Sequence, residues 1–219
     1  MAGMDIALIG GHGKVALLAA PLLVEAGHTV HSVIRNPDHA GEVEATGATA
    51  VLADIETLDE GGWDELLRGK DAVVWAAGAG GGDPERTRAV DLDAAVASMD
   101  AADRVGATRY VMVSYFGASL DHGVPEDNPF HTYAEAKARA DEHLRGTGLA
   151  WTILGPSGLT LEEPTGRIDT AASESGTVSR GNVARTIVAA LAEPASVGRF
   201  VTYNDGEQEI GEAFASLSR

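Results

Sequence analysis

The chain has 219 residues, of which 44% are hydrophobic and 22% charged, and its formal net charge at pH 7 is −17. This length suits one domain with a sizeable core, and the lack of cysteine excludes disulfide scaffolds, iron–sulfur clusters and thiol nucleophiles. The acidic balance argues against nucleic acid and anionic membranes as partners, because both require a cationic surface.

Short β-rich runs alternate along the chain with longer segments of helical period. In chain order, the expected strands are 6–9, 29–34, 50–53, 71–75, 110–113, 151–154 and 200–202. The expected helices are 15–26, 40–45, 58–67, 84–104, 132–145, 183–191 and 210–217. This alternation predicts an α/β fold: a Rossmann-type doubly wound parallel sheet with helices on both faces. We expect a flexible loop over 78–82, and a single domain over 1–219 in which 157–180 form a small, loop-rich C-terminal substrate lobe.

A glycine-rich turn follows the first expected strand and opens the first expected helix. Its sequence is Gly10-Gly11-His12-Gly13-Lys14-Val15-Ala16. Glycines at tight bends let the backbone approach a pyrophosphate, whose charge is met by N–H groups at the helix N-terminus. Such a turn also forms without a ligand, but its place between strand and helix favours a dinucleotide site. His12 could donate to a phosphate or face solvent.

The distribution of charge sharpens this prediction. The first 67 residues hold eleven Asp and Glu but only two basic residues, Lys14 and Arg35. Lys14 lies in the glycine turn, and Arg35 follows the second strand, where NAD-specific folds carry an acid for the ribose 2′-hydroxyl. A cation there suits a 2′-phosphate, so we expect NADP (NADPH) in preference to NAD. The alternative is an exposed Arg35 paired with Asp38.

A second motif contains candidate catalytic residues. Tyr133 and Lys137 are four residues apart on one face of an expected helix. A nearby ammonium favours tyrosinate and lowers the phenol pKa, which would make Tyr133 an acid or base for carbonyl–alcohol interconversion. The ammonium could also hold ribose hydroxyls of the nicotinamide half. Ser114 ends the preceding strand.

Taken together, these segments resemble the short-chain dehydrogenase/reductase superfamily. More narrowly, the chain is similar to the atypical NAD(P)-binding branch that includes NmrA-like and biliverdin-reductase-B-like proteins. The resemblance covers nearly the whole chain. It is carried by the glycine turn and by residues 33–37, 53–55, 71–78, 90–91, 110–118, 133–137 and 152–160.

The resemblance implies further roles. Asp54 and Ile55 would contact the adenine. The segment Ala76, Ala77 and Gly78 would run alongside the ribose and diphosphate. Asp91 takes the place of an active-site Asn, Tyr133 would donate the proton with Lys137 as its partner, and Pro156 would lie near the nicotinamide.

Two departures from the family pattern stand out. Relatives usually carry paired serines where this chain has Ser114-Tyr115-Phe116, so the catalytic position could be one step from Ser114. Relatives also often carry an arginine where this chain has Gly155. The substrate side of this chain therefore lacks a cation that those relatives have.

The sequence thus predicts an NADP-dependent oxidoreductase that moves hydride to or from a small carbonyl or quinone-like compound. A non-catalytic NADP(H)-binding sensor is the alternative. A nucleotide-sugar epimerase is disfavoured, because few residues follow Pro156 to build a substrate lobe.

The remaining expectations concern surroundings and partners. No histidine pair has a zinc spacing, so we expect no metal. No stretch reaches the ~18–20 apolar residues of a membrane span, and the first residues lack a basic signal region, so we expect a cytoplasmic protein with no membrane partner. Expected helices 84–104 and 132–145 could pair between subunits, which leaves both a homodimer and a monomer open.

Overall fold

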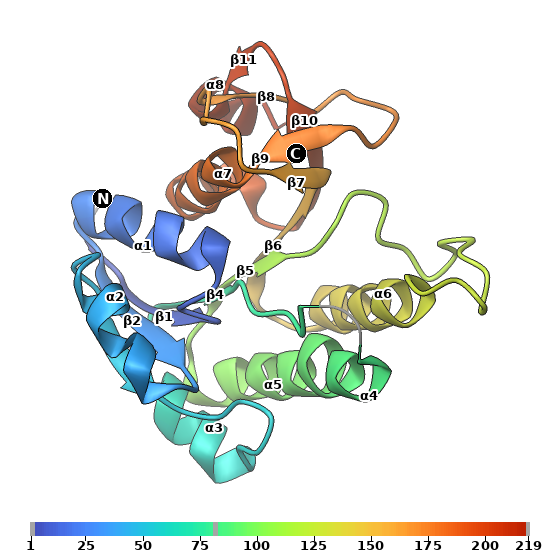
Figure 1. Cartoon of the computed structure of the whole chain (residues 1–219). Coiled ribbons are helices and arrows are strands. Elements are labelled where there is room, and N and C mark those ends of the chain that lie inside the picture. The colour runs from blue at the N-terminus through green and yellow to red at the C-terminus, as the bar shows by residue number, and fades with distance from the viewer. Residues whose placement is uncertain (1–2, 81–82, 218–219) are drawn as a thin grey trace.

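The computed structural model describes residues 3–80 and 83–217, and its centre is a nine-stranded sheet (Figure 1). The strands are β1 (Asp5–Ile9), β2 (Thr29–Ile34), β3 (Thr49–Leu52), β4 (Ala72–Trp75), β5 (Arg109–Val113), β6 (Ala150–Pro156), β8 (Arg167–Asp169), β10 (Arg199–Asp205) and β11 (Gln208–Glu209). Their order is β11-β8-β10-β6-β5-β4-β1-β2-β3. The seven strands from β10 to β3 pair in parallel, and β8 pairs antiparallel with β10 and β11. This order confirms the predicted Rossmann-type fold.

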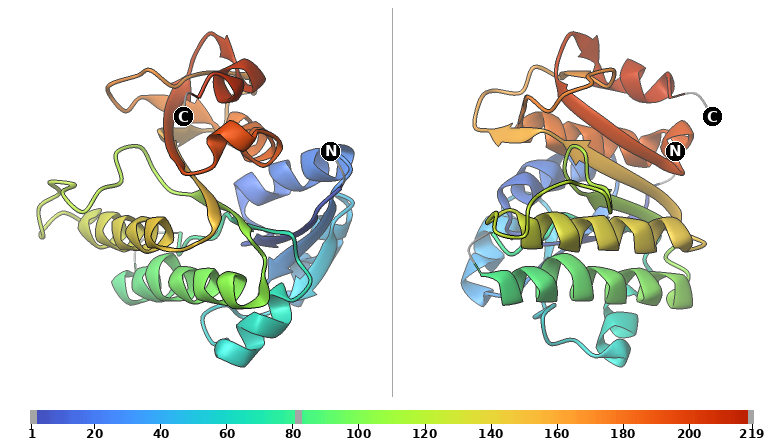
Figure 2. Two further views of the ribbon diagram at one scale, coloured as in Figure 1. Left: turned by 180° about the vertical axis from the view of Figure 1, so that it is seen from behind. Right: turned by 90° about the vertical axis from the view of Figure 1, so that its right-hand side faces the viewer.

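Helices cover both faces of the sheet (Figure 2). They are α1 (Lys14–Glu25), α2 (Ala40–Glu44), α3 (Glu60–Leu67), α4 (Pro84–Thr87), η2 (Arg88–Ala94), α5 (Ala95–Val105), α6 (His131–Gly146), α7 (Arg180–Ala192) and α8 (Ile210–Ala215), with short 3-10 turns η1 (Pro37–His39) and η3 (Pro194–Ser196). Side chains alternate along β1: Ile6 and Leu8 pack under α1, α7 and α8, whereas Ala7 and Ile9 pack under α3, α5 and α6. The two faces therefore bury separate hydrophobic clusters.

One expectation needs correction. The expected regular helix 84–104 is instead three successive segments, because η2 is π-helical between α4 and α5. The segment 157–180, expected to be loop-rich, contains three short strands between its loops: β7 (Gly158–Thr160) and β9 (Thr177–Ser179), which form their own two-stranded parallel sheet, and β8. Of the loop expected over 78–82, Gly81 and Gly82 lie outside the described residues.

One arginine ties several elements together at the amino end of β5. The Arg109 guanidinium donates to the carbonyl oxygens of Ala150 and Ala190 at 2.5 and 2.7 Å, to Thr152 Oγ1 at 2.7 Å and to Ser196 Oγ at 3.1 Å. These acceptors lie on β6, α7 and η3. Burial lowers the pKa of Arg109 to about 10, so the side chain stays protonated at neutral pH.

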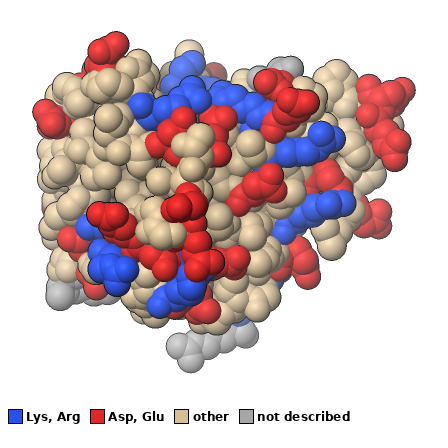
Figure 3. All heavy atoms as spheres, turned by 90° about the horizontal axis from the view of Figure 1, so that it is seen from below, with Lys and Arg blue, Asp and Glu red and all other residues tan. Residues whose placement is uncertain are grey.

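The surface mixes the two signs of charge. On the face formed below α3 and α5 in Figure 1, acidic and basic side chains are interspersed (Figure 3). Ion pairs on the helices include Arg104–Asp64, between α5 and α3, and Arg145–Glu142, within α6. Among the described residues, no helix has the length and apolar character needed to cross a membrane.

Candidate functional site

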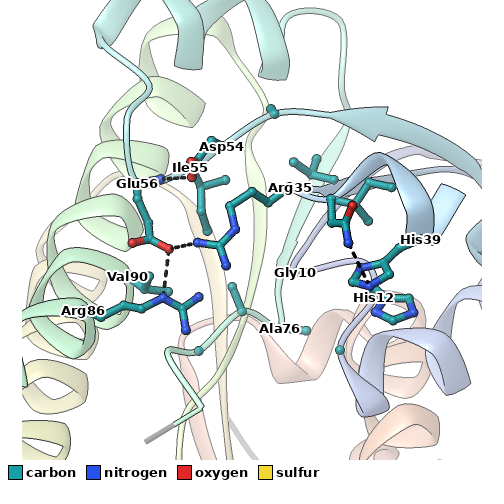
Figure 4. Close-up of a pocket in the computed structure, with 17 residues that line it drawn as sticks. Gly10, His12, Arg35, His39, Asp54, Ile55, Glu56, Ala76, Arg86 and Val90 are labelled. Atoms are coloured by element: carbon teal, nitrogen blue, oxygen red, sulfur yellow. Dashed lines mark hydrogen bonds and ion pairs between the residues drawn. The ribbon is translucent and has the colours of Figure 1, made fainter. Parts of the chain in front are cut away.

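A pocket of about 280 Å³ opens at the carboxyl ends of β1, β2, β3 and β4 (Figure 4). The chain reverses direction across the sheet between β1 and β4, and such a switch point is where open α/β sheets bind ligands. Many of the predicted cofactor residues line it: Gly10, His12, Gly13, Arg35, Asp54, Ile55, Ala76, Ala77 and Gly78. Four others, Lys14, Val15, Lys137 and Pro156, are not among its lining residues.

The glycine turn has a structural reason as well as a ligand-binding one. Gly10 has φ +81°, and a Cβ there would lie 2.6 Å from Ala77 Cα. Gly13 caps α1, and its N–H donates to the Gly10 carbonyl at 2.8 Å. Lys14 begins α1 with an exposed side chain, whereas Val15 packs against the hydrophobic core. The turn brings the backbone of Gly10 and Gly13 and the side chain of His12 to the wall of the pocket.

Arg35 reaches across the pocket to a carboxylate that the sequence did not indicate. Its Nη1 donates to Glu56 Oε1 at 2.8 Å, and Arg86 Nε donates to the same oxygen at 3.0 Å. The expected alternative partner was wrong, because the backbone N–H of Asp38 instead bonds Asn36 Oδ1, and no Arg35–Asp38 pair occurs in the described part of the chain. Glu56 and Arg86 lie 21 and 51 positions beyond Arg35, so nothing local in the sequence relates them.

A stacked histidine pair forms another part of the same pocket. The rings of His12 and His39 lie 3.6 Å apart between centroids. His12 Nε2 is 3.0 Å from Glu42 Oε2, and His39 Nε2 is 3.4 Å from Asn36 Nδ2. His12 therefore does not simply face solvent, since its ring is held against the pocket by these neighbours.

Next to the pocket, Asp91 approaches the predicted catalytic pair. Its Oδ1 lies 3.3 Å from where a Cβ on Gly78 would be, and its Oδ2 accepts from the Ala79 N–H at 3.0 Å. Burial raises the pKa of Asp91, against the opposing charge of Lys137. Lys137 is itself buried, and its Nζ donates to the Val113 carbonyl at 2.9 Å. Asp91 on η2 and Lys137 on α6 are thus close enough for their charges to interact.

The pKa of Tyr133 is shifted upward, opposite to the direction that a nearby Lys137 ammonium alone would give. Burial raises the pKa of Tyr133, and the negative charges of Asp91 and Asp141 raise it further. The Lys137 ammonium is instead directed to the Val113 carbonyl and the Met112 sulfur. Tyr133 is therefore a neutral phenol across the physiological pH range, which suits a proton donor rather than a base.

Ser114, which was predicted to be catalytic, is not among the residues that line the pocket. Its side chain is buried, and Oγ donates to Asp141 Oδ2 at 2.5 Å. The next residue, Tyr115, packs its ring against Tyr133 and Phe130 at centroid distances of 5.7 and 5.3 Å. Its hydroxyl is buried with no partner among the described residues. The serine therefore anchors the end of β5 to α6, and Tyr115 occupies the position beside Tyr133.

The Tyr133–Lys137 motif did not include Asp141, which also belongs to the site. Its spacing of four residues from Lys137 places it on the same helical face and could have indicated it. Burial raises its pKa to about 6 from the ordinary 3.8. A carboxyl whose pKa is higher in the folded state costs stability as pH rises from about 4 through about 6. Asp141→Asn should therefore raise the free energy of unfolding at pH 7.5 by about 1–3 kcal/mol.

Urea unfolding at pH 4 and pH 7.5 measures this effect. The gain should disappear at pH 4, and Asp103→Asn, at an exposed position, should show no gain at either pH. A gain for Asp141→Asn that is equal at both pH values would rule out titration of this carboxyl as its cause.

Pro156 ends β6, and its carbonyl accepts from the Phe116 N–H at 2.9 Å. This bond ties the segment after β5 to the end of β6. Within residues 3–80 and 83–217, no three His, Asp or Glu side chains gather in a way that could hold a metal ion.

Comparisons with known proteins agree with this geometry. The NAD(P)H-binding family model matches residues 10–194. The protein YhfK of Bacillus subtilis (strain 168), named an uncharacterized sugar epimerase, is 34% identical over 220 residues, which cover 98% of this chain and 100% of YhfK. The crystal structure of the oxidoreductase ylbE from Lactococcus lactis has a TM-score of 0.87 and 28% identity, covering 98% of this chain and 96% of that chain. The chain therefore belongs to the NAD(P)H-binding family.

Proposed function

We propose that this protein is an NADPH-dependent oxidoreductase that reduces a small carbonyl or quinone-like acceptor. The observation that carries the proposal is the pocket at the carboxyl ends of β1 to β4, which the glycine turn lines and which Asp91 borders at Gly78. Tyr133 lies close enough to Asp91 for this acid to raise the pKa of the phenol. Bound NADPH would supply the hydride, and Tyr133 would donate the proton to the acceptor oxygen. The neutral phenol is the form that can donate this proton, and the phenolate left behind would take a proton back from solvent before the next turnover.

The other residues have supporting parts in this proposal. The pocket residues of the glycine turn and the loops after β3 and β4 would hold the dinucleotide. Asp91 accepts the Ala79 N–H and so fixes the loop after β4. The Lys137 ammonium, near Asp91, would balance the negative charge around Tyr133. The family model, described as NAD(P)H-binding, and the name oxidoreductase borne by ylbE support a reductase.

The preference for NADPH is tested by comparing both cofactors. Arg35 is the predicted contact of the 2′-phosphate, so wild type should bind NADPH at least about tenfold more tightly than NADH, as a charge-assisted contact of this kind provides. Arg35→Ala should remove most of that ratio and leave NADH affinity within about twofold. Thermal shift at graded cofactor concentrations reports both affinities, and equal shifts for the two cofactors in wild type would contradict the assignment of Arg35.

One observation favours a second candidate function, a non-catalytic sensor of NADP(H). Ser114 is committed to Asp141 instead of the pocket, so the proton-donating set is not the one that the family resemblance implies. Steady oxidation of NADPH with any member of a carbonyl and quinone panel would exclude the sensor. Binding of NADPH without oxidation across that panel would favour it.

A further inference from the structure

The three charged side chains that meet in the pocket come from three separate elements. Arg35 follows β2, Glu56 follows β3, and Arg86 lies on α4. All three line the pocket, and Figure 4 shows Glu56 between the two guanidinium groups. The side chains of Arg35, Arg86 and Glu56 are 57%, 37% and 22% exposed. The carboxylate is thus the least exposed of the three and the two cations remain accessible.

Both arginines use the same acceptor atom. Glu56 Oε1 receives Arg35 Nη1 at 2.8 Å and Arg86 Nε at 3.0 Å. A phosphate oxygen is an equivalent acceptor for guanidinium groups, and a phosphate monoester has three oxygens and up to two charges to offer them. Asp54 also lines the pocket and balances the remaining positive charge, so a phosphate would gain from the arginines by taking the place of the Glu56 carboxylate.

The cluster is held from both sides. Arg86 Nη1 donates to the Ala79 carbonyl at 2.7 Å, which fixes this arginine to the loop after β4. The backbone N–H of Glu56 donates to Asp54 Oδ1 at 3.2 Å, which fixes the start of its segment. Arg35 is the most exposed member and the one free to turn. A ligand oxygen could therefore replace the Glu56 carboxylate without moving the loops.

We propose that Arg35 and Arg86 together form a two-arginine site for a phosphate monoester, and that Glu56 is an internal competitor for it. The inference rests on the proposed function, in which the monoester is the 2′-phosphate of NADPH. It assigns Arg86 as a second specificity-determining residue and Glu56 as the residue that weakens binding. Arg35 alone would bind the phosphate with a single side chain, whereas the pair can hold two of its oxygens.

The test measures binding of adenosine 2′,5′-bisphosphate and adenosine 5′-diphosphate by isothermal titration calorimetry, without turnover. Glu56→Gln keeps the size of the side chain but removes its charge. It should lower the Kd of the 2′,5′-bisphosphate about threefold to tenfold, because each arginine pair with Glu56 is of the strength of a surface ion pair. The Kd of the 5′-diphosphate should change by less than about twofold. This comparison separates a 2′-phosphate from a diphosphate as the ligand group.

A matched control removes the same charge elsewhere. Glu209 pairs with Arg167 at 2.9 Å in the C-terminal region, away from the pocket, and Glu209→Gln should leave both Kd values unchanged. The gain from Glu56→Gln should also vanish in the Arg86→Gln background, with thermal unfolding confirming that the double variant is folded. A gain that persists without Arg86 overturns the two-arginine site.

The outcomes separate this inference from the proposed function. Unchanged or weaker binding of the 2′,5′-bisphosphate by Glu56→Gln overturns the competitor role, and so does a failure of both proteins to bind it. If wild type then still oxidises NADPH with a carbonyl or quinone acceptor, the proposed function stands without the inference. If Glu56→Gln gives the gain but no acceptor is reduced, the site stands and the oxidoreductase proposal fails.

Discussion

Tyr133→Phe should lower the rate of NADPH oxidation about 10²–10⁴-fold with every acceptor that the wild type reduces, which is the usual contribution of a positioned proton donor. Removing the hydroxyl leaves the ring in contact with Phe130, at a centroid distance of 5.2 Å, so the fold should be kept. The Kd of NADPH should stay within about twofold, since the phenol is proposed to act on the acceptor and not on the cofactor.

Tyr115→Phe is the matched control, because its hydroxyl is the other phenol of the same aromatic cluster. It should retain activity within about threefold if Tyr133 is the donor. The raised pKa of Tyr133 also predicts that the wild-type rate does not fall between pH 7 and 9 through loss of this proton. Full activity of Tyr133→Phe combined with a large loss in Tyr115→Phe would transfer the donor role to Tyr115.

Arg109→Met should lower the free energy of unfolding by about 2–4 kcal/mol, since two carbonyls and two hydroxyls lose their donor in the interior. The aliphatic part of methionine replaces the arm of the arginine but none of its N–H groups. The loss acts where β5, β6, α7 and η3 meet, so urea unfolding should show the whole transition shifting with a single midpoint.

The control for this experiment is Arg167→Met, which removes an exposed arginine bound to Glu209. Its effect on the free energy of unfolding should stay within about 0.5 kcal/mol, as is usual for exposed ion pairs. A loss below 1 kcal/mol in Arg109→Met would mean that water replaces the guanidinium at these acceptors.

Much of the fold could be predicted from local patterns. The strand expected over 29–34 coincides with β2, and the expected parallel order followed from the alternation of strands and helices. What failed depends on packing between distant segments. The π-helical turn of η2 gives no clear apolar signal, because one of its three buried residues is Asp91. The strands β7, β8 and β9 are three residues each, too short to show a period.

The candidate site divides in the same way. The glycine turn and the spacing of Tyr133 and Lys137 are local motifs, and the sequence indicated both. The partners that set their chemistry are distant: Glu56 for Arg35, and Asp91 for Lys137. The sign of the Tyr133 pKa shift was missed for this reason, because motif spacing shows the nearby ammonium but neither burial nor two carboxylates. Nothing in the sequence distinguished Arg109 from a surface arginine, because the acceptors of its guanidinium on β6, α7 and η3 lie 41 to 87 positions further along the chain.

The π-helical segment Arg88–Ala94 has a consequence for how the chain tolerates changes of length. A π turn holds one residue more than the α-helix it interrupts, so deleting one residue there would let α4 continue into α5 as a regular helix. The buried face of α5, with Ala95 and Met99, would keep its place on the sheet, while the carboxylate of Asp91 would rotate away from Ala79. The position of this acid is therefore set by the number of residues before α5 as much as by their identity, and a single-residue deletion would move Asp91 together with its buried neighbour Val90.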